Sequence, residues 1–338
     1  MKAVVIEKPG SLALHDVRDT KVDDYQALVR TLACSICNGT DMKIVDGTIP
    51  FFGPEGYPGL LGHESVGRIV RTGRKVTTFN EGDLVLRAMA DVDGYNCCWG
   101  GFAEFGTVTD LAALEADGAQ PSNRAHHKGQ QIIPADADLL EATICITLKE
   151  VLSYLRGMQV KAGDSLLVLG YGPVGLSFAD LAKVIGMSPV IVAGRRSDGL
   201  RQAMKFGADE TVHLNSETID EKVHEVQKDG VDFIVDATGV SWLVEESAKA
   251  LKPGGKIGLY AVVDSDKKHV DRNAIGAAIA NVGPDEASAH DEVMRLWRSG
   301  RIQPEKYISH VLPIADMETG FELIRNKQAT KVVLNIGG

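Results

Sequence analysis

The most constraining feature of this 338-residue sequence is the segment Ser165–Leu181, which reads SLLVLGYGPVGLSFADL. An apolar run is followed by a glycine-rich turn and then by apolar residues at helical spacing, which predicts a buried strand, a tight turn and a helix. In such a turn one glycine permits the bend, the next lets the backbone approach a pyrophosphate, and the third lets helix pack on strand. We therefore predict that a dinucleotide binds at Gly170, Gly172, Pro173, Val174 and Gly175.

The chain is long enough for two domains, because single cores stop growing near about 250–300 residues. Up to about residue 114, short β-like runs alternate with Gly and Pro, which predicts a β-rich domain. From Ser165 onward, strands and helices alternate, which predicts a doubly wound parallel sheet. The predicted strands of this sheet are Ser165–Leu169, Pro189–Ala193, Glu210–Leu214, Val231–Ala237 and Lys256–Ala261.

The last predicted strand, Lys331–Ile336, needs a sheet to enter, and the nearest β structure is the N-terminal part. We therefore expect one discontinuous β-rich domain, 1–147 with 289–338, and a dinucleotide-binding domain, 148–288. The polar segment Asp117–Gly129 lacks periodicity and predicts a surface loop, whereas Ala137–Met158 has the apolar spacing of a buried helix.

Composition excludes several classes of function. The formal net charge of -10 and a pI of about 5.4 provide no basic excess to neutralise nucleic-acid phosphates. No apolar run approaches the roughly 20 residues that span a bilayer, and the N-terminus has no secretory pattern, so a cytoplasmic protein is expected. An odd, sparse set of cysteines favours reduced thiols or metal ligands over disulfides. These are Cys34, Cys37, Cys97, Cys98 and Cys145.

The second predicted strand of the parallel sheet leads into Gly194, Arg195 and Arg196. NAD sites usually have an acidic residue here, roughly 20 residues beyond the glycine turn, which binds the ribose hydroxyls. Gly194 removes that carboxylate, and two arginines can form charge-assisted hydrogen bonds with a 2′-phosphate. The pattern favours NADP(H) over NAD(H); the alternative is a solvated loop.

Potential zinc ligands occur in the β-rich part, in Cys34–Asp41 and in Gly62-His63-Glu64. A catalytic zinc keeps three protein ligands and one open position, and Cys, His and Glu all serve as ligands. Each residue also has another interpretation. Cys34 or Cys37 alone could be a core thiol, the pair could be redox-active, and the Gly-His-Glu segment could be structural.

An ordered set of motifs resembles the zinc-dependent medium-chain dehydrogenases, in particular their sorbitol/threonine dehydrogenase-like branch. The motifs are Cys37 with Gly39-Thr40-Asp41, Gly62-His63-Glu64, Gly100–Phe105, the glycine turn, Asp236–Gly239, Lys252–Gly255 and Lys331–Leu334. The resemblance covers essentially the whole chain. It implies an α/β protein with a GroES-like β-rich catalytic domain and a Rossmann domain. It also implies a nicotinamide cofactor that meets an alcohol at a catalytic zinc.

By this resemblance, Cys37 and His63 match zinc ligands and Glu64 matches the acid beside the metal. Thr40 matches the hydroxyl that begins the proton relay, and Thr238 lies in a motif expected to contact the cofactor.

The chain departs from the family pattern at several positions. One extra residue separates Cys37 from Thr40, and Lys43 stands where many members have a relay histidine. The remaining zinc ligand could be Cys145, with Glu150 one helical turn on as a substitute, or the metal could rest on Cys37, His63 and Glu64 alone. Only Cys97-Cys98 remain of a structural-zinc lobe, so no structural zinc is expected.

Some side chains keep two interpretations. Trp99 could border a substrate cleft or belong to the core. His126-His127 could border the same cleft or belong to a solvated flap, and the flap is preferred. Lys331 could approach the cofactor or be exposed on a strand edge.

The function expected from these features is zinc-dependent hydride transfer between NADP(H) and a secondary alcohol, polyol or sugar-type substrate. Two alternatives remain, a zinc-less NADPH-dependent quinone or alkene reductase and a non-catalytic dinucleotide-binding protein. The family resemblance also implies a homodimer or homotetramer, with Lys256–Val263 as a contact strand.

Overall fold

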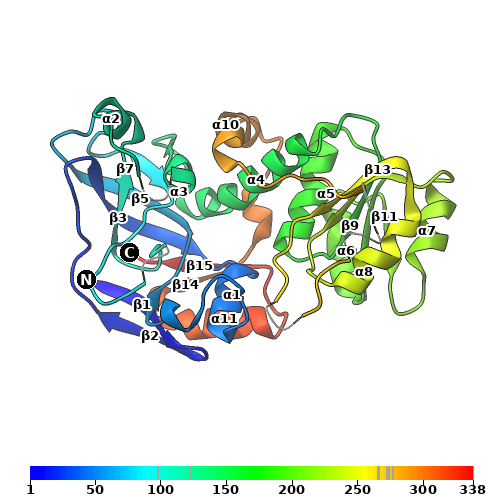
Figure 1. Cartoon of the computed structure of the whole chain (residues 1–338), viewed down its shortest axis with the longest axis horizontal. Coiled ribbons are helices and arrows are strands. Elements are labelled where there is room, and N and C mark those ends of the chain that lie inside the picture. The colour runs from blue at the N-terminus through cyan, green and yellow to red at the C-terminus, as the bar shows by residue number, and fades with distance from the viewer. Residues whose placement is uncertain (97–98, 122–123, 265–266, 272–274, 276–277, 338) are drawn as a thin grey trace. The chain divides into compact units, whose positions relative to one another are not determined.

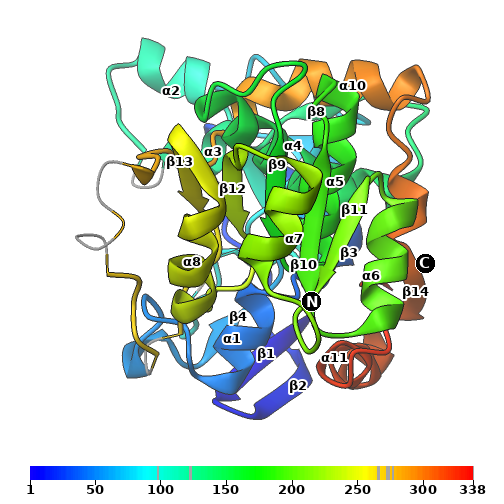
Figure 2. The same ribbon diagram turned by 90° about the vertical axis from the view of Figure 1, so that its right-hand side faces the viewer.

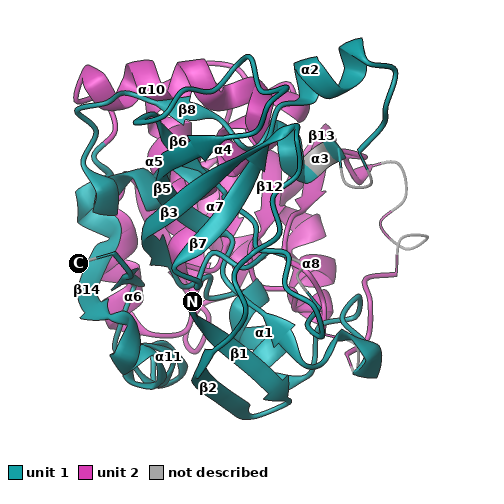
Figure 3. Cartoon of the chain, turned by 90° about the vertical axis from the view of Figure 1, so that its left-hand side faces the viewer, with its two compact units in different colours: residues 1–146, 303–338 teal, residues 147–302 magenta. Residues whose placement is uncertain are grey.

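The computed structural model describes residues 1–96, 99–121, 124–264, 267–271, 275 and 278–337. The chain forms two compact units, Met1–Ile146 with Gln303–Gly338, and Thr147–Ile302 (Figure 3). The domain limits given above, at 147/148 and 288/289, remain a prediction, because compactness alone does not show which part folds independently. Among the described residues, no helix is both long and apolar enough to cross a membrane.

The first unit contains two sheets (Figure 1). The smaller sheet has the strand order β2 (Ser11–Asp16), β1 (Lys2–Lys8), β4 (Gly59–Leu60). The larger sheet has the order β14 (Ile308–Pro313), β15 (Lys331–Asn335), β3 (Gln26–Ser35), β5 (Glu64–Thr72), β6 (Leu84–Leu86), β8 (Ile132–Ile133), and β7 (Phe105–Thr109) also pairs with β3.

The register of the larger sheet brings distant parts of the sequence together. Ser35, at the end of β3, pairs with Glu64 at the start of β5 and with Val333 of β15 on its other side. The expectation that the last strand enters the N-terminal sheet is confirmed by this pairing. The end of β3, the start of β5 and the start of β15 therefore meet at one place, where the potential zinc ligands lie.

Short helices connect the strands of the first unit. They are α1 (Thr40–Asp46), η1 (Pro54–Gly56), α2 (Leu111–Ala116), α3 (Arg124–Lys128), η5 (Pro304–Tyr307), η6 (Ile314–Asp316) and α11 (Met317–Arg325). The prediction of a surface loop or flap over Asp117–Gly129 missed the helix α3 within it. Five residues are too few to produce a recognisable helical period in the sequence.

The second unit contains the predicted parallel sheet (Figure 2). Its strand order is β11 (Glu210–His213), β10 (Val190–Gly194), β9 (Leu166–Leu169), β12 (Val231–Asp236), β13 (Leu251–Leu259). All four pairings are parallel. Strands β9 and β10 are buried along their whole length, as expected for strands covered by helices on both faces.

The helices of the second unit are α5 (Pro173–Ile185), α6 (Ser197–Lys205), α7 (Ile219–Val226), α8 (Ser241–Ser247), η2 (Ala248–Ala250), η4 (Glu286–Ala289) and α10 (His290–Arg298). Helix α4 (Leu139–Gly157) runs from the first unit into the second. Strand order changes direction at β9, and ligands of such sheets bind at the carboxyl ends of the strands beside that point. The glycine turn follows β9 there. Strand β13, which overlaps the predicted contact segment at residues 256–259, lies at a sheet edge, and the oligomeric state remains a prediction.

Candidate active site

The glycine turn has the local geometry of a phosphate-binding loop. Gly170 has a φ of +99°, and a Cβ added there would lie 2.7 Å from a methyl group of Thr238. A Cβ on Gly175 would lie 2.1 Å from the carbonyl oxygen of Gly170. A Cβ on Gly172 would meet no atom within 4 Å, so this side of the turn is open. Helix α5 begins directly afterwards at Pro173, with its unpaired N–H groups available to an anion.

Thr238 is held beside this turn by Asp236, the last residue of β12. The Asp236 carboxylate accepts hydrogen bonds from the Thr238 N–H at 2.8 Å and from the Thr238 hydroxyl at 2.6 Å. It also accepts from the Gly239 N–H at 3.1 Å. Because the Asp236 carboxylate is buried, these hydrogen bonds hold the loop that faces Gly170 in place. Thr238 therefore lies next to the predicted phosphate site.

The two arginines after β10 differ in their partners. Arg196 binds Asp198 through two guanidinium nitrogens, and this pairing lowers the pKa of Asp198 to about 2. The guanidinium of Arg195 lies over the ring of Trp242, 5.6 Å from its centre. In the described part of the chain, no ion pair of Arg195 occurs. The positive charge of Arg195 is therefore more available to a bound anion than that of Arg196.

Three potential metal ligands converge in the first unit. The Sγ of Cys37, a ring nitrogen of His63 and a carboxylate oxygen of Glu64 all lie within 4.8 Å of one another. Cys37 follows β3, Glu64 begins β5 and His63 directly precedes it, so the strand register described above brings them together. Sulfur, imidazole and carboxylate donors in this number are typical of a catalytic zinc. The donor set fits that metal.

Asp41 is wholly buried and contacts two of the three potential ligands, Cys37 and His63. One oxygen accepts a hydrogen bond from the Cys37 N–H at 2.9 Å, and the other lies 3.4 Å from Nδ1 of His63. Neither that oxygen nor Nδ1 has a hydrogen-bond partner in the described structure, so the contact between them is an electrostatic one. Burial alone would lower the pKa of His63, but Asp41 and Cys37 raise it well above its usual value. Asp41 thus orients the histidine, as carboxylates often do for metal-binding imidazoles.

Glu64 forms a buried ion pair with Lys331. The same Glu64 oxygen accepts short hydrogen bonds from Lys331 Nζ and from the Ser35 hydroxyl. Lys331 also donates to the Ile36 carbonyl at 3.2 Å. Burial alone would raise the pKa of Glu64, but Lys331 lowers it; burial alone would lower the pKa of Lys331, but Glu64 raises it. Both groups are therefore charged at neutral pH.

The position of Lys331 corrects its interpretation as an exposed lysine on a strand edge. The side chain is only 2% exposed, so it is not a solvated edge lysine, and its partner is Glu64. Strand β15 has neighbours on both sides, β14 and β3, and is therefore not an edge strand.

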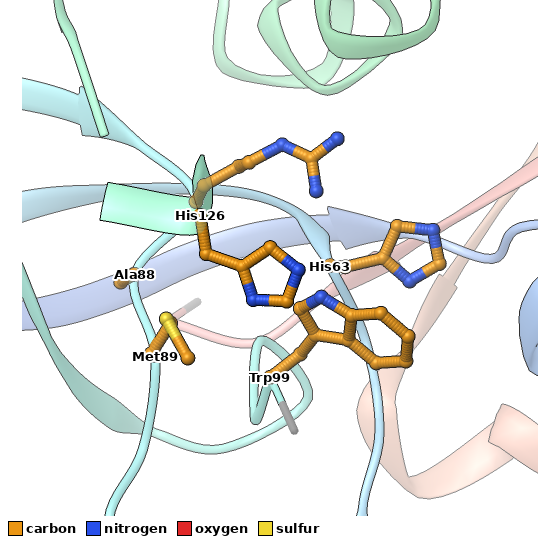
Figure 4. Close-up of a pocket in the computed structure, with 6 residues that line it drawn as sticks. His63, Ala88, Met89, Trp99 and His126 are labelled. Atoms are coloured by element: carbon orange, nitrogen blue, oxygen red, sulfur yellow. The ribbon is translucent and has the colours of Figure 1, made fainter. Parts of the chain in front are cut away.

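A pocket borders the metal-ligand cluster (Figure 4). The ring of Trp99 lies 4.8 Å from that of His63 and 5.8 Å from that of His126, so the three rings are side by side. The interpretation of His126 as part of a solvated flap is wrong, because α3 brings it to this pocket. The lining residues are His63, Arg87, Ala88, Met89, Trp99 and His126.

The other predicted residues have different surroundings. The grouped ligands do not include Cys145, which is buried in α4. Glu150 lies in the second unit, where the Tyr260 hydroxyl donates to it at 3.2 Å. The backbone N–H of Thr40 donates to Cys37 Sγ at 3.4 Å, which places the residue beside the cluster. The prediction that Cys97 and Cys98 hold no structural zinc concerns residues outside the described ones.

Sequence reasoning gave no role to Asp41 or Ser35. The sequence did contain a hint for Asp41, because this residue belongs to the same motif as Cys37. In the structure its carboxylate accepts a hydrogen bond from the Cys37 N–H. Ser35 had no such hint, and Lys331 was singled out for a different role, since the roles of both depend on a partner from another strand.

Comparison with known proteins gives matches over most of the chain. A family model described as "Alcohol dehydrogenase GroES-like domain" matches residues 23–122, and one described as "Zinc-binding dehydrogenase" matches residues 173–282. An L-threonine 3-dehydrogenase of Bacillus licheniformis is 28% identical, over 99% of this chain and 98% of its own. D-arabinitol dehydrogenase 1 of Uromyces fabae is 26% identical, over 99% and 97%.

A solved structure gives the same result. The alcohol dehydrogenase TADH from Thermus sp. ATN1 is similar, with a TM-score of 0.82 and 25% identity, over 99% of both chains.

Proposed function

Because this chain belongs to the zinc-type medium-chain alcohol dehydrogenase superfamily, we propose that it oxidises a secondary alcohol, polyol or sugar-type substrate with NADP⁺ and reduces the corresponding carbonyl. Family membership confirms the predicted GroES-like β-rich domain and Rossmann domain. The observation that carries the proposal is the convergence of Cys37, His63 and Glu64 within 4.8 Å.

In this proposal, Cys37 and His63 hold the zinc and Glu64 is the third group at the metal. A zinc ion bound there would supply the Lewis acidity that lowers the pKa of an alcohol, and a bound nicotinamide would supply the hydride acceptor. Asp41 keeps His63 oriented, and the Lys331 ammonium keeps Glu64 ionised. Thr40, beside Cys37 at the start of α1, would accept a hydrogen bond from the substrate hydroxyl and pass its own proton on toward solvent as it receives the substrate's, so that it relays the proton and does not retain it. Cys145 remains a candidate ligand only by resemblance to the family.

The chemistry of the side chains beside His63 suits a polar substrate. Arg87 is only 8% exposed, and it lies beside Trp99 in the lining of the pocket described above. A guanidinium donates several hydrogen bonds in a fixed plane, and an aromatic face suits the C–H surface of a sugar or polyol. The backbone of Arg87 has a φ of 57°, a conformation that costs energy in a non-glycine residue and is often kept at functional sites.

The proposed preference for NADP(H) rests on the positions after β10. Gly194 carries no carboxylate that would repel a 2′-phosphate, and Arg195 has no carboxylate partner among the described residues. Arg196 is already paired with Asp198. Arg195 is therefore the stronger candidate for the phosphate.

Replacing Arg195 by alanine is expected to raise the Kd for NADP⁺ by about tenfold or more, because one charge-assisted hydrogen bond contributes about 1.5–3 kcal/mol. The Kd for NAD⁺ should change less than about twofold. Arg196→Ala is the matched control and should have the smaller effect on NADP⁺. Equal weakening of both cofactors by Arg195→Ala, in titrations by intrinsic fluorescence, would contradict the assignment.

The reaction itself is tested by assaying a panel of polyols and sugar alcohols with NADP⁺ and with NAD⁺, before and after metal chelation. Oxidation that depends on metal and prefers NADP⁺ is the expected result. Chelator-insensitive reduction of quinones or alkenes would instead support the zinc-less reductase. Tight cofactor binding without turnover of any substrate would support a non-catalytic protein.

A further inference from the structure

Tyr171, the residue between the first two glycines of the phosphate turn, occupies a slot formed by two other glycines. A Cβ on Gly194 would lie 2.0 Å from Cε1 of the Tyr171 ring, and a Cβ on Gly199 would lie 2.0 Å from Cε2. Real Cβ atoms do not approach so closely, so neither position accepts a side chain while the ring is there. The end of β10 and the first turn of α6 thus enclose opposite edges of one aromatic ring.

The Tyr171 hydroxyl is fixed at the arginine segment. It accepts a hydrogen bond from the Arg196 N–H at 3.0 Å. A phenol both accepts and donates, and its proton has no acceptor among the described residues. The hydroxyl can therefore donate its own proton to a ligand next to Arg195 and Arg196, where the 2′ position of an adenosine ribose is expected.

We propose that Tyr171 is a specificity-determining cofactor residue, which selects the 2′-phosphorylated dinucleotide; the inference rests on the proposed preference for NADP(H). The ring keeps position 194 a glycine, so no carboxylate can stand where NAD enzymes bind the ribose hydroxyls. The hydroxyl donates a hydrogen bond to the 2′-phosphate beside Arg195.

The surrounding charges favour the same ligand. The acidic side chain of this segment, Asp198, is paired with the guanidinium of Arg196. Its carboxylate is therefore already engaged and does not serve as the acceptor for the ribose hydroxyls. The Tyr171 hydroxyl and the Arg195 guanidinium are both donors. Donors without an accompanying carboxylate match a dianionic phosphate better than a ribose hydroxyl.

The hydroxyl is tested with Tyr171→Phe, which keeps the ring in its slot and removes one oxygen. The dissociation constants for NADPH and NADH are measured by fluorescence titration. We expect the Kd for NADPH to rise about tenfold and that for NADH to change less than about twofold, with the same melting temperature. If both constants rise equally, or neither changes, the inference is wrong.

The slot is tested without any cofactor. Gly194→Ala should lower the melting temperature in the wild-type background, because its Cβ meets the ring, and should be tolerated in the Tyr171→Ala background. An equal loss in both backgrounds would overturn the role of the ring.

The two levels of the proposal fail differently. Wild-type protein that binds NADH as tightly as NADPH would contradict the proposed cofactor, and the inference with it. Wild-type protein that prefers NADPH, while Tyr171→Phe keeps the full preference, would contradict the inference alone.

Discussion

Replacing Cys37 by serine or His63 by alanine is expected to remove bound zinc and to lower kcat/KM for alcohol oxidation by on the order of 10³-fold. Both residues belong to the one ligand group found in the described part of the chain. With either ligand gone, too few strong donors remain to retain the metal. Elemental analysis of the purified variants measures the zinc, and steady-state kinetics measures the activity.

Cys34→Ala is the matched control. Cys34 belongs to the same segment but is wholly buried in the apolar core, and burial raises the pKa of its thiol, so it remains protonated. This variant should lose some stability and keep its zinc. A Cys37→Ser protein with full zinc content and full activity would contradict the assigned ligands.

Lys331→Met is expected to lower the free energy of unfolding of the metal-free protein by about 3–5 kcal/mol. The substitution leaves the Glu64 carboxylate buried without its ammonium partner, and an uncompensated buried charge is costly. Urea denaturation measures the change. The exposed pair of Arg74 and Asp24 provides a control, because Arg74→Met should cost less than about 1 kcal/mol.

The double variant Glu64→Gln, Lys331→Met separates the pair from general packing. Removing both charges should restore part of the stability lost in Lys331→Met, since neither partner is then left charged and alone. Additive losses in the double variant would show that the two side chains act independently, against the ion pair described above.

Local sequence was sufficient for much of the fold. The glycine turn, the alternating strands and helices of the second unit and the apolar strands of the first depend on neighbouring residues, whose spacing is visible in the sequence. The helix α3 was missed because one short turn has no period. Strands β4 and β8 have two residues each, which is too short to show alternation.

Parts of the site depend on contacts between distant segments. Lys331 is a polar residue at the start of a strand, and only the pairing of β15 with β3 shows that it is buried against Glu64. Gly194 could be interpreted as an absent acid, but its contact with Tyr171 supplies a packing reason for the same glycine. Such contacts cannot be found from spacing in one sequence.

The most direct test of the account is the activity of the purified wild-type protein toward a responsive polyol with NADP⁺, followed through chelation and readdition of zinc. We expect one zinc per Cys37–His63–Glu64 site, loss of oxidation as the zinc is removed, and recovery when zinc is restored. Undiminished oxidation by protein shown to contain no metal would contradict the central claim.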